Sequence, residues 1–385
     1  MRIARRIESL PPYLFAELDR RLETKRAEGV DVISLGVGDP DTPTPRHIVE
    51  AVQEAAADPS THQYPSYYGM PAFRGAIAEW YRTRFDVTLD PDSQVLPLIG
   101  SKEGLAHLSV AFIDPGDEAL VPDPGYPVFG IGTMLAGGTP VPMPLDAAGG
   151  FLPDLDSVPV GPTTKILWLN YPSNPTAAVA ELPFFEQAVE FARSHGLLLA
   201  HDAAYSEMTF DGFVAPSVLQ VPGATDVAVE FGSVSKSHNM TGWRAGWVVG
   251  NAEAIRALST VKTNLDSGIW NAVQHAAIAA LTGPQDHVEE ARALYSKRRD
   301  VVLETFTSLG WDVTPPRGSI YVWLPTPEGE GSAHFATRLL DSTGVVVAPG
   351  TGYGAAGEGY FRVSLTVQDD RLAEAMDRIR GALSR

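Results

Sequence analysis

The stretch KILWLNYPSNPTAAVAELPFFEQAVEFARSHGLLLAHD, residues 165–202, decides the fold. Near its two ends lie short apolar runs, Lys165–Leu169 and Leu197–Ala200, each too short for a helix and rich in strand-forming residues. Between them, Leu182–Ser194 has the periodicity of a helix. Two strands joined through a helix run parallel, and parallel sheets are covered by helices on both faces. The stretch therefore predicts one unit of a parallel α/β sheet.

The same alternation extends outward in both directions. Further strands are predicted at Glu118–Val121, Val227–Phe231 and Trp247–Val249, and helices at Arg46–Ala57, Ala72–Arg84 and Lys102–Phe112. Repeated strand–helix alternation is typical of a largely parallel sheet flanked by helices. We expect this larger α/β domain to span residues 46–280.

A different pattern follows Asn251. Three helical stretches reach about Leu309, and then come a strand, a helix, two strands and a closing helix that starts at Asp369; the three strands are Ile320–Leu324, Val345–Ala348 and Tyr360–Leu365. Near the other end, a helix over Pro12–Glu28 and a strand over Val32–Leu35 are predicted. We expect a smaller α/β domain made of residues 281–385 and 1–45, with the N-terminal segment folding back onto the C-terminal part.

Composition limits the classes of function. The net charge of −18 disfavours nucleic acid and anionic membrane surfaces as partners. The absence of cysteine excludes disulfides, cysteine nucleophiles and thiolate metal sites, and no metal is expected. The uncharged stretch Pro124–Leu145 holds five glycines and five prolines, so it is not a membrane helix. The N-terminus lacks the apolar core of a signal peptide, and we expect a cytoplasmic protein.

A lysine among hydroxyl groups marks the first candidate site. In GSVSKSHNMTGWR, residues 232–244, Lys236 follows a predicted strand, where open α/β sheets bind ligands. Ser233, Ser235 and Arg244 are residue types that hold a phosphate, and a desolvated lysine beside another cation becomes a carbonyl-attacking amine. Spacing alone leaves a solvated loop with an ordinary lysine equally open.

This segment resembles the Schiff-base lysine segment of the fold-type I aminotransferases that depend on pyridoxal 5′-phosphate (PLP). The resemblance runs over nearly the whole chain in nine stretches: GVGDPDTPTP (36–45), YPSYYGMPAFR (64–74), GSKEG (100–104), DPGYPVF (123–129), NYPSNPT (170–176), HDAAYSE (201–207), SVSKSHNMTGWRAGW (233–247), KTNLDSGIWNAVQHAA (262–277) and GVVVAPGTGYGAAGEGYFRVSL (344–365). The chain is most similar to the LL-diaminopimelate aminotransferase group, which implies a role in amino-acid biosynthesis leading to lysine.

The resemblance implies a cofactor site for PLP. Lys236 is expected to bind the cofactor and to move a proton between the substrate Cα and C4′. Asp202 is expected to keep the pyridine nitrogen protonated, with a helix N-cap as its alternative role. Asn174 and Tyr205 are expected to donate to the phenolate oxygen, with a turn before Pro175 as the alternative for Asn174.

The resemblance also implies residues for the phosphate and the ring. Ser101 and Lys102, at the start of a helix, are expected to hold the phosphate together with Ser233 and Arg244, and Tyr64 to add its hydroxyl from the other subunit of a homodimer. The alternative for Lys102 is a solvated first-turn lysine. Tyr126 is expected to stack on the ring, with a core tyrosine as its alternative.

Arg362 is the expected ligand of the substrate carboxylate. It lies in a predicted half-buried strand, where an arginine requires an anion, and the resemblance implies help from the Gly36 backbone and the Asn174 side chain. An acidic residue of this chain is the alternative partner. Polar contacts to a distal carboxylate, as in 2-oxoglutarate, are expected from Asn264, Ser267 and Trp270 of the neighbouring chain.

Three other functions stay open at this point. An alanine- or aspartate-type aminotransferase differs only in loop residues. A PLP-dependent carbon–sulfur β-lyase would use the same scaffold, because the reaction depends on which Cα bond stands perpendicular to the ring. A non-catalytic protein that kept the fold is disfavoured, because Lys236, Asp202, Arg244 and Arg362 are all present.

Overall fold

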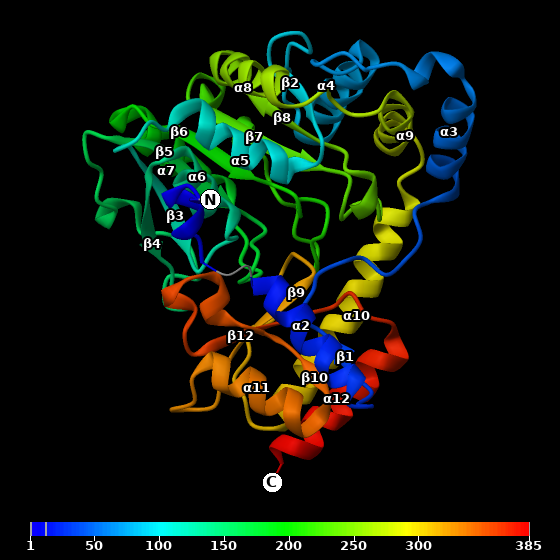
Figure 1. Ribbon diagram of the computed structural model, residues 1–385, viewed down its shortest axis with the longest axis vertical. Helices are drawn as coiled ribbons and strands as arrows, with labels where there is room; N and C mark the ends of the chain where they lie inside the picture. The colour runs from blue at the N-terminus through cyan, green and yellow to red at the C-terminus, as the bar shows by residue number, and fades with distance from the viewer. Residues whose placement is uncertain (1, 12–13, 385) are drawn as a thin grey trace.

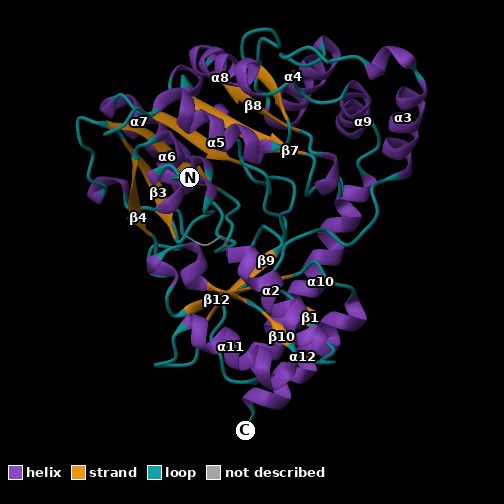
Figure 2. Cartoon of the chain, in the orientation of Figure 1, coloured by secondary structure: helices purple, strands orange, loops and turns teal. Residues whose placement is uncertain are grey.

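The computed structural model describes residues 2–11 and 14–384, and two bodies of unequal size lie one above the other (Figure 1). The larger body holds a seven-stranded sheet with helices on both faces (Figure 2). Its strands are β2 (Val95–Leu98), β3 (Glu118–Asp123), β4 (Thr139–Pro144), β5 (Thr164–Asn170), β6 (Leu198–Asp202), β7 (Ala228–Ser233) and β8 (Gly246–Gly250). Its helices are α3 (Arg46–Ala57), α4 (Pro71–Phe85), α5 (Ser101–Phe112), α6 (Val128–Ala136), α7 (Leu182–His195), α8 (Ala252–Leu265) and α9 (Asn271–Thr282).

The large sheet is mostly parallel, as the alternation predicts. Its strand order is β2-β8-β7-β6-β5-β3-β4, and only the β2–β8 and β7–β8 pairs are antiparallel. Successive residues of β5 face opposite ways, so that Leu167 and Leu169 belong to one apolar cluster and Trp168 to another. Burial on both faces explains why these strands are continuous apolar runs. The predicted α/β class, a mostly parallel sheet flanked by helices, is confirmed.

The smaller body contains β9 (Tyr321–Pro325), α11 (Ser332–Thr343), β10 (Val345–Val346), β11 (Ala348–Pro349), β12 (Tyr360–Ser364) and α12 (Asp369–Leu383). Helix α10 (Asp286–Ser308) runs from the larger body down to it (Figure 1). Strands β11, β12 and β9 form an antiparallel sheet. Short 3₁₀ turns complete the chain: η1 (Pro59–His62), η2 (Leu155–Ser157), η3 (Val218–Gln220), η4 (Ala224–Asp226), η5 (Thr241–Trp243), η6 (Gly350–Tyr353) and η7 (Ala355–Gly357).

The N-terminal segment returns to the smaller body. Strand β1 (Ile33–Ser34) pairs in parallel with β10, which places Ile33 opposite Val345. Helix α2 (Leu14–Ala27) lies over the same body (Figure 1), and the predicted first two residues of this helix fall outside the described residues. The short helix α1 (Arg5–Glu8) instead contacts α6 of the larger body. The N-terminal segment therefore touches both bodies.

Among the elements that the sequence patterns do not anticipate are α6 and β4. Both lie in the stretch rich in glycine and proline that follows β3. Strand β4 is the edge strand of the sheet, so a proline in it removes no hydrogen bond from a second neighbour. Among the described residues, no helix has the length and apolar character needed to cross a bilayer.

Candidate active site

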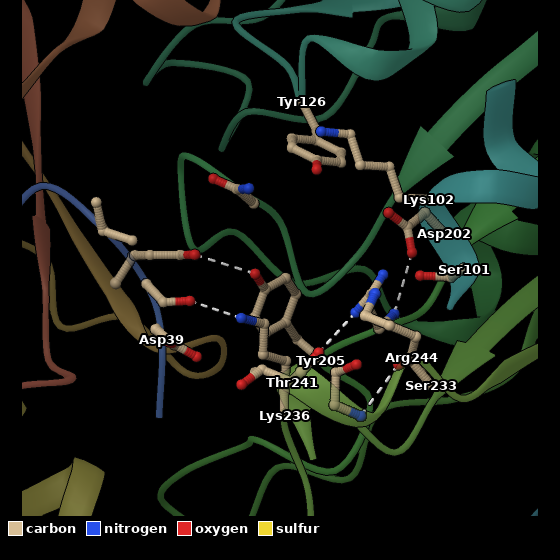
Figure 3. A pocket seen from close by; sticks show the side chains of 16 residues that line it. Asp39, Ser101, Lys102, Tyr126, Asp202, Tyr205, Ser233, Lys236, Thr241 and Arg244 are labelled. Atoms are coloured by element: carbon tan, nitrogen blue, oxygen red, sulfur yellow. Dashed lines mark hydrogen bonds between the residues drawn. The ribbon is translucent and has the colours of Figure 1, made fainter. Parts of the chain in front are cut away.

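A pocket of about 360 Å³ lies at the carboxyl ends of the large sheet, beside the smaller body (Figure 3). Most of the predicted site residues line it: Ser101, Lys102, Tyr126, Asn174, Asp202, Tyr205, Ser233, Lys236 and Arg244. They come from the ends of β2, β3, β5, β6 and β7, because strands that run in one direction deliver their last residues to one edge. The smaller body adds Tyr321 from β9.

Lys236 reaches across the pocket toward the N-terminal segment (Figure 3). Its Nζ donates to the carbonyl oxygen of Gly38 at 2.6 Å. Burial lowers the pKa of Lys236, and the nearby Arg362 and Arg244 act in the same direction. A lysine with a lowered pKa offers a larger fraction of free amine, which is the form that attacks a carbonyl carbon.

Asp202 is the last residue of β6 and is buried. Burial raises the pKa of Asp202 to about 6, although the adjacent His201 and the backbone N–H of Ala204 oppose the shift. That N–H donates to Oδ1 at 3.3 Å. The carboxyl group thus sits in the pocket wall at the end of a strand, where its ionised form can accept a hydrogen bond from a protonated ring nitrogen of a ligand.

The two predicted donors to a ring oxygen lie on the side of the smaller body. The Tyr205 hydroxyl is 3.1 Å from that of Tyr321, and burial raises the pKa of Tyr205. Asn174 accepts a hydrogen bond at Oδ1 from Arg362 at 2.6 Å, which leaves its amide NH₂ as the end that can donate to a ligand.

The other end of the pocket is built for an anion. Helix α5 begins at Ser101, so its first backbone N–H groups and its dipole face the pocket. Gly100 has φ +74°, and a Cβ there would lie 2.2 Å from Nη2 of Arg244. A Cβ on Gly246 would lie 2.7 Å from the Ser101 nitrogen. Helix, hydroxyl groups and guanidinium thus form a close cradle with the donors that a phosphate needs.

Lys102 and Tyr126 lie together at one side of the pocket (Figure 3). The Lys102 ammonium lies 5.9 Å from the ring centre of Tyr126. The aromatic face of Tyr126 lines the pocket, and a flat ligand can stack there. The residues present therefore fit PLP: a reactive amine, a carboxylate for the pyridine nitrogen, donors for the ring oxygen and a phosphate cradle.

Arg362 lies beyond this pocket wall, on β12. The sequence pattern predicts a half-buried strand, but four of the five residues of β12, Arg362 among them, are buried, because the N-terminal segment covers this strand. Its Nη2 donates to the carbonyl oxygen of Gly36 at 2.6 Å, and the guanidinium lies 3.8 Å from the ring centre of Tyr321. The predicted trio of Arg362, Asn174 and Gly36 is therefore joined by direct hydrogen bonds.

Sequence reasoning missed six residues that line the pocket: Val37, Gly38, Asp39, Ala204, Thr241 and Tyr321. Burial acts to raise the pKa of Tyr321, but the cationic Arg362 and Lys236 outweigh it and lower that pKa. Gly38 and Asp39 belong to the quoted GVGDPDTPTP stretch, which was a usable signal. Tyr321 lies in an ordinary strand pattern, and only the tertiary fold brings it to the pocket.

Tyr64 lies away from the pocket of its own chain and is 87% exposed. Asn264, Ser267 and Trp270 also do not line it. A Cβ on Gly268 would lie 3.0 Å from the Ser66 carbonyl oxygen, so the loop of Tyr64 and the loop 266–270 are neighbours on the surface. Lys262 is the only lysine or arginine in residues 262–270. It is buried, and its Nζ lies 2.9 Å from Oδ1 of Asp266.

The fold and the pocket together define a fold-type I enzyme that uses PLP. The family model for aminotransferase class I and II matches residues 30–379. The LL-diaminopimelate aminotransferase of Desulforudis audaxviator is 57% identical over 99% of this chain and 98% of its own length. The LL-diaminopimelate aminotransferase of Moorella thermoacetica is 54% identical over 100% of this chain and 99% of its own length. The substrate-bound structure of BacF from Bacillus subtilis, 37% identical, superposes with a TM-score of 0.94 over 99% of this chain and 98% of that one. The chain belongs to the class I and II aminotransferases and is a PLP-dependent enzyme of that family.

Proposed function

We propose that the enzyme transfers the amino group of LL-diaminopimelate to 2-oxoglutarate. The observation that carries this proposal is the end-to-end identity of 57% and 54% with two proteins named LL-diaminopimelate aminotransferase. A substrate with a charged distal end also agrees with the polar side chains proposed in the segment 264–270, at the end of α8 and in the loop after it.

We propose the following division of labour within the pocket. Lys236 binds the cofactor and moves the proton between the substrate Cα and C4′, and Asp202 holds the proton of the pyridine nitrogen. PLP supplies the electron-accepting ring that stabilises negative charge at the Cα. Tyr205 and Asn174 donate to the ring oxygen, and Tyr126 covers the ring face. Their positions around one cavity support these roles.

Binding of the two charged ends is assigned as follows. The phosphate is held by Ser101, Lys102, Ser233 and Arg244, at the start of α5. The substrate carboxylate is held by Arg362, whose guanidinium is already oriented by Asn174 and Gly36. An orienting frame of this kind lowers the entropy that the arginine loses on binding an anion.

The working unit is proposed to be a homodimer with shared active sites. Tyr64 would contact the cofactor phosphate in the active site of the partner chain. The neighbouring segment 264–270 would contact the distal end of the substrate in that same site. The 87% exposure of Tyr64 in the single chain supports this, because an unpaired aromatic surface favours a protein interface. Two further predictions concern the domains and the location. The predicted domains are residues 46–280 and, together, residues 1–45 and 281–385; one apolar core cluster that contains Ile33, Val345 and Phe361 supports this division. The predicted location is the cytoplasm.

The experiment that tests the substrate is a panel of amino donors with 2-oxoglutarate, compared by kcat/KM. We expect LL-diaminopimelate to exceed alanine and aspartate. If it falls more than tenfold below either, which is about 1.4 kcal/mol, the substrate assignment fails and an alanine- or aspartate-type enzyme replaces it. Half-reactions that depend on a keto acid, monitored through the absorbance of the cofactor, distinguish transamination from β-lyase chemistry.

A further inference from the structure

Two oppositely charged residue types lie side by side in the core of the large sheet, outside the pocket. His201 on β6 stands directly opposite Glu230 on β7 in the strand register. Both side chains are buried, with relative exposures of 0% and 1%. His201 directly precedes Asp202, and consecutive residues of a strand face opposite sides of the sheet. The pair thus lies behind the strand end that carries Asp202.

The hydrogen bonds of Glu230 indicate an ionised carboxylate. Oε1 accepts from the hydroxyl groups of Tyr81 and Ser217, each at 2.9 Å. Oε2 accepts from the backbone N–H of Val218 at 2.9 Å and lies 3.0 Å from Nδ1 of His201. All four groups around the two carboxylate oxygens act as donors. A protonated Glu230 would therefore find no acceptor for its own proton. A buried negative charge requires a counter-charge, and His201 is the partner in reach.

The surroundings of His201 indicate that both ring nitrogens carry protons. Nδ1 faces the Glu230 carboxylate, and Nε2 lies 3.1 Å from the Tyr171 carbonyl oxygen. Both partners are acceptors, so an imidazolium satisfies both contacts. The backbone N–H of Tyr171 also donates toward Nε2, at the longer distance of 3.3 Å, and a singly protonated ring would accept it. The second ring proton therefore follows from the counter-charge that the buried Glu230 carboxylate requires. Asp202 is adjacent in the chain, and the aromatic neighbours of the pair carry no charge: burial raises the pKa of Tyr81 and of Tyr171, and the Phe185 ring centre lies 4.8 Å from that of the imidazole.

We propose that the Glu230–His201 pair is a positioning pair for Asp202: Glu230 keeps His201 cationic, and the imidazolium keeps the adjacent Asp202 ionised. This inference rests on the proposed role of Asp202 toward the pyridine nitrogen. The electrostatics have the required sign, because the positive charge of His201 opposes the effect of burial on the pKa of Asp202. Without the cation, the carboxyl group would keep its own proton in the pocket.

The test uses holoenzyme reconstituted with PLP labelled with ¹⁵N in the pyridine ring. In the wild type, the ¹⁵N shift should report a protonated ring nitrogen, and Asp202→Asn should move it toward the unprotonated value. Glu230→Gln and His201→Gln should each move it in the same direction. Each one-unit rise in the pKa of Asp202 changes its ratio of ionised to protonated form tenfold. We therefore expect kcat to fall about tenfold or more, with KM for the amino donor within about twofold.

Glu207→Gln is the matched control, because Glu207 is another buried carboxylate, 8% exposed and 2.9 Å from Arg84, that does not line the pocket. It should lower the melting temperature without moving the ring signal. If Asp202→Asn moves the signal and neither Glu230→Gln nor His201→Gln does, the pairing inference fails while the role of Asp202 stands. If Asp202→Asn leaves the signal unchanged, the proposed role itself fails.

A second measurement needs no folded variant at position 230. In wild-type holoenzyme labelled with ¹⁵N-histidine, the His201 signals, assigned with His201→Gln or by through-bond correlation, should show two protonated ring nitrogens at neutral pH. A singly protonated ring would overturn the inference, whatever the variants do.

Discussion

The guanidinium of Arg362 donates to Oδ1 of Asn174 at 2.6 Å and thereby joins the smaller sheet to the loop after β5. Arg362 is thus a bridge between the two bodies as well as the expected ligand of the substrate carboxylate. Its second nitrogen is held by Gly36, so its position depends on the N-terminal segment also. If Arg362 holds the substrate carboxylate as proposed, substrate binding and the arrangement of the two bodies are coupled at one side chain.

Replacing this arginine by lysine should remove the flat, two-pronged contact while keeping the charge. For Arg362→Lys we expect a loss of about 1.5 to 3 kcal/mol, or roughly 10- to 150-fold in kcat/KM, which is the worth of hydrogen bonds to a charged group. Arg371→Lys is the matched control, because Arg371 pairs with the exposed Asp31 on the surface. Steady-state kinetics with several amino donors provide the measurement, and equal losses in both variants would contradict the assignment.

Lys236 should be the single site of covalent attachment. Borohydride reduction of the yellow holoenzyme, followed by peptide mapping, should place the pyridoxyl group on Lys236. Lys236→Ala should lose transamination by several orders of magnitude, because the nucleophile and the proton carrier vanish together. Lys297→Ala should keep full activity, since Lys297 is 68% exposed and pairs with Asp369. Recovery of the label on Lys102 or Lys262 would refute the assignment.

Gly100 tests the phosphate cradle. In Gly100→Ala, the new methyl group would collide with Arg244 in addition to straining the backbone. Gly212→Ala also places a side chain at a positive φ, +75°, but in open space. We expect both variants to lose about 1 to 3 kcal/mol of stability. Only Gly100→Ala should weaken PLP binding by about tenfold or more, a change of about 1.4 kcal/mol, measured by titration of the apoenzyme. Equal PLP affinities would show that Arg244 moves aside without cost.

Tyr64 tests the shared active site by complementation. If Tyr64 serves the partner chain, a mixed dimer of Lys236→Ala and Tyr64→Phe chains contains one intact site and one doubly defective site. Mixing the two variants should therefore restore activity above the sum of the two separate preparations. Tyr68→Phe, another exposed tyrosine, should bind PLP as the wild type does. An absence of restored activity in proven heterodimers would place Tyr64 outside the partner's site.

The sequence predicts the buried strands well, because their signal is local. Lys165–Leu169 and Leu197–Ala200 lie within β5 and at β6, and the helix Leu182–Ser194 differs from α7 by one residue. The signal fails in α6 and β4. Helix α6 contains two glycines, and β4 has a proline at every second residue, which is tolerated only because the strand is at the edge.

The residues of the candidate site also fall into two groups: those that a local sequence pattern predicts and those that only tertiary packing brings to the site. Lys236, Ser233 and Arg244 follow a predicted strand, so a sequence window contains both the residues and their setting. Tyr321 has no such window, because its position above the pocket is created by the packing of β9 against the larger body. The His201–Glu230 pair is equally invisible, because strand register, which fixes its 3.0 Å contact, is a tertiary property.

The last prediction concerns His238, two residues beyond the reactive lysine. Its Nε2 donates to the Ala280 carbonyl oxygen at 2.9 Å, and burial, reinforced by the nearby His287, lowers its pKa to about 3. An unfolded histidine has a pKa near 6.5, so between these values the unfolded chain binds the extra proton and stability falls as the pH falls. At pH 5 this term is about 2 kcal/mol. Asp202 acts in the opposite direction between about pH 4 and 6, but it is present in every variant compared.

We therefore expect the melting temperature of the wild type to fall more steeply from pH 7 to pH 5 than that of His238→Gln, in which the amide can still donate to Ala280. His275→Gln, at an exposed position on α9, should follow the wild type. Parallel curves for His238→Gln and the wild type would mean that His238 takes up its proton without unfolding the surrounding core.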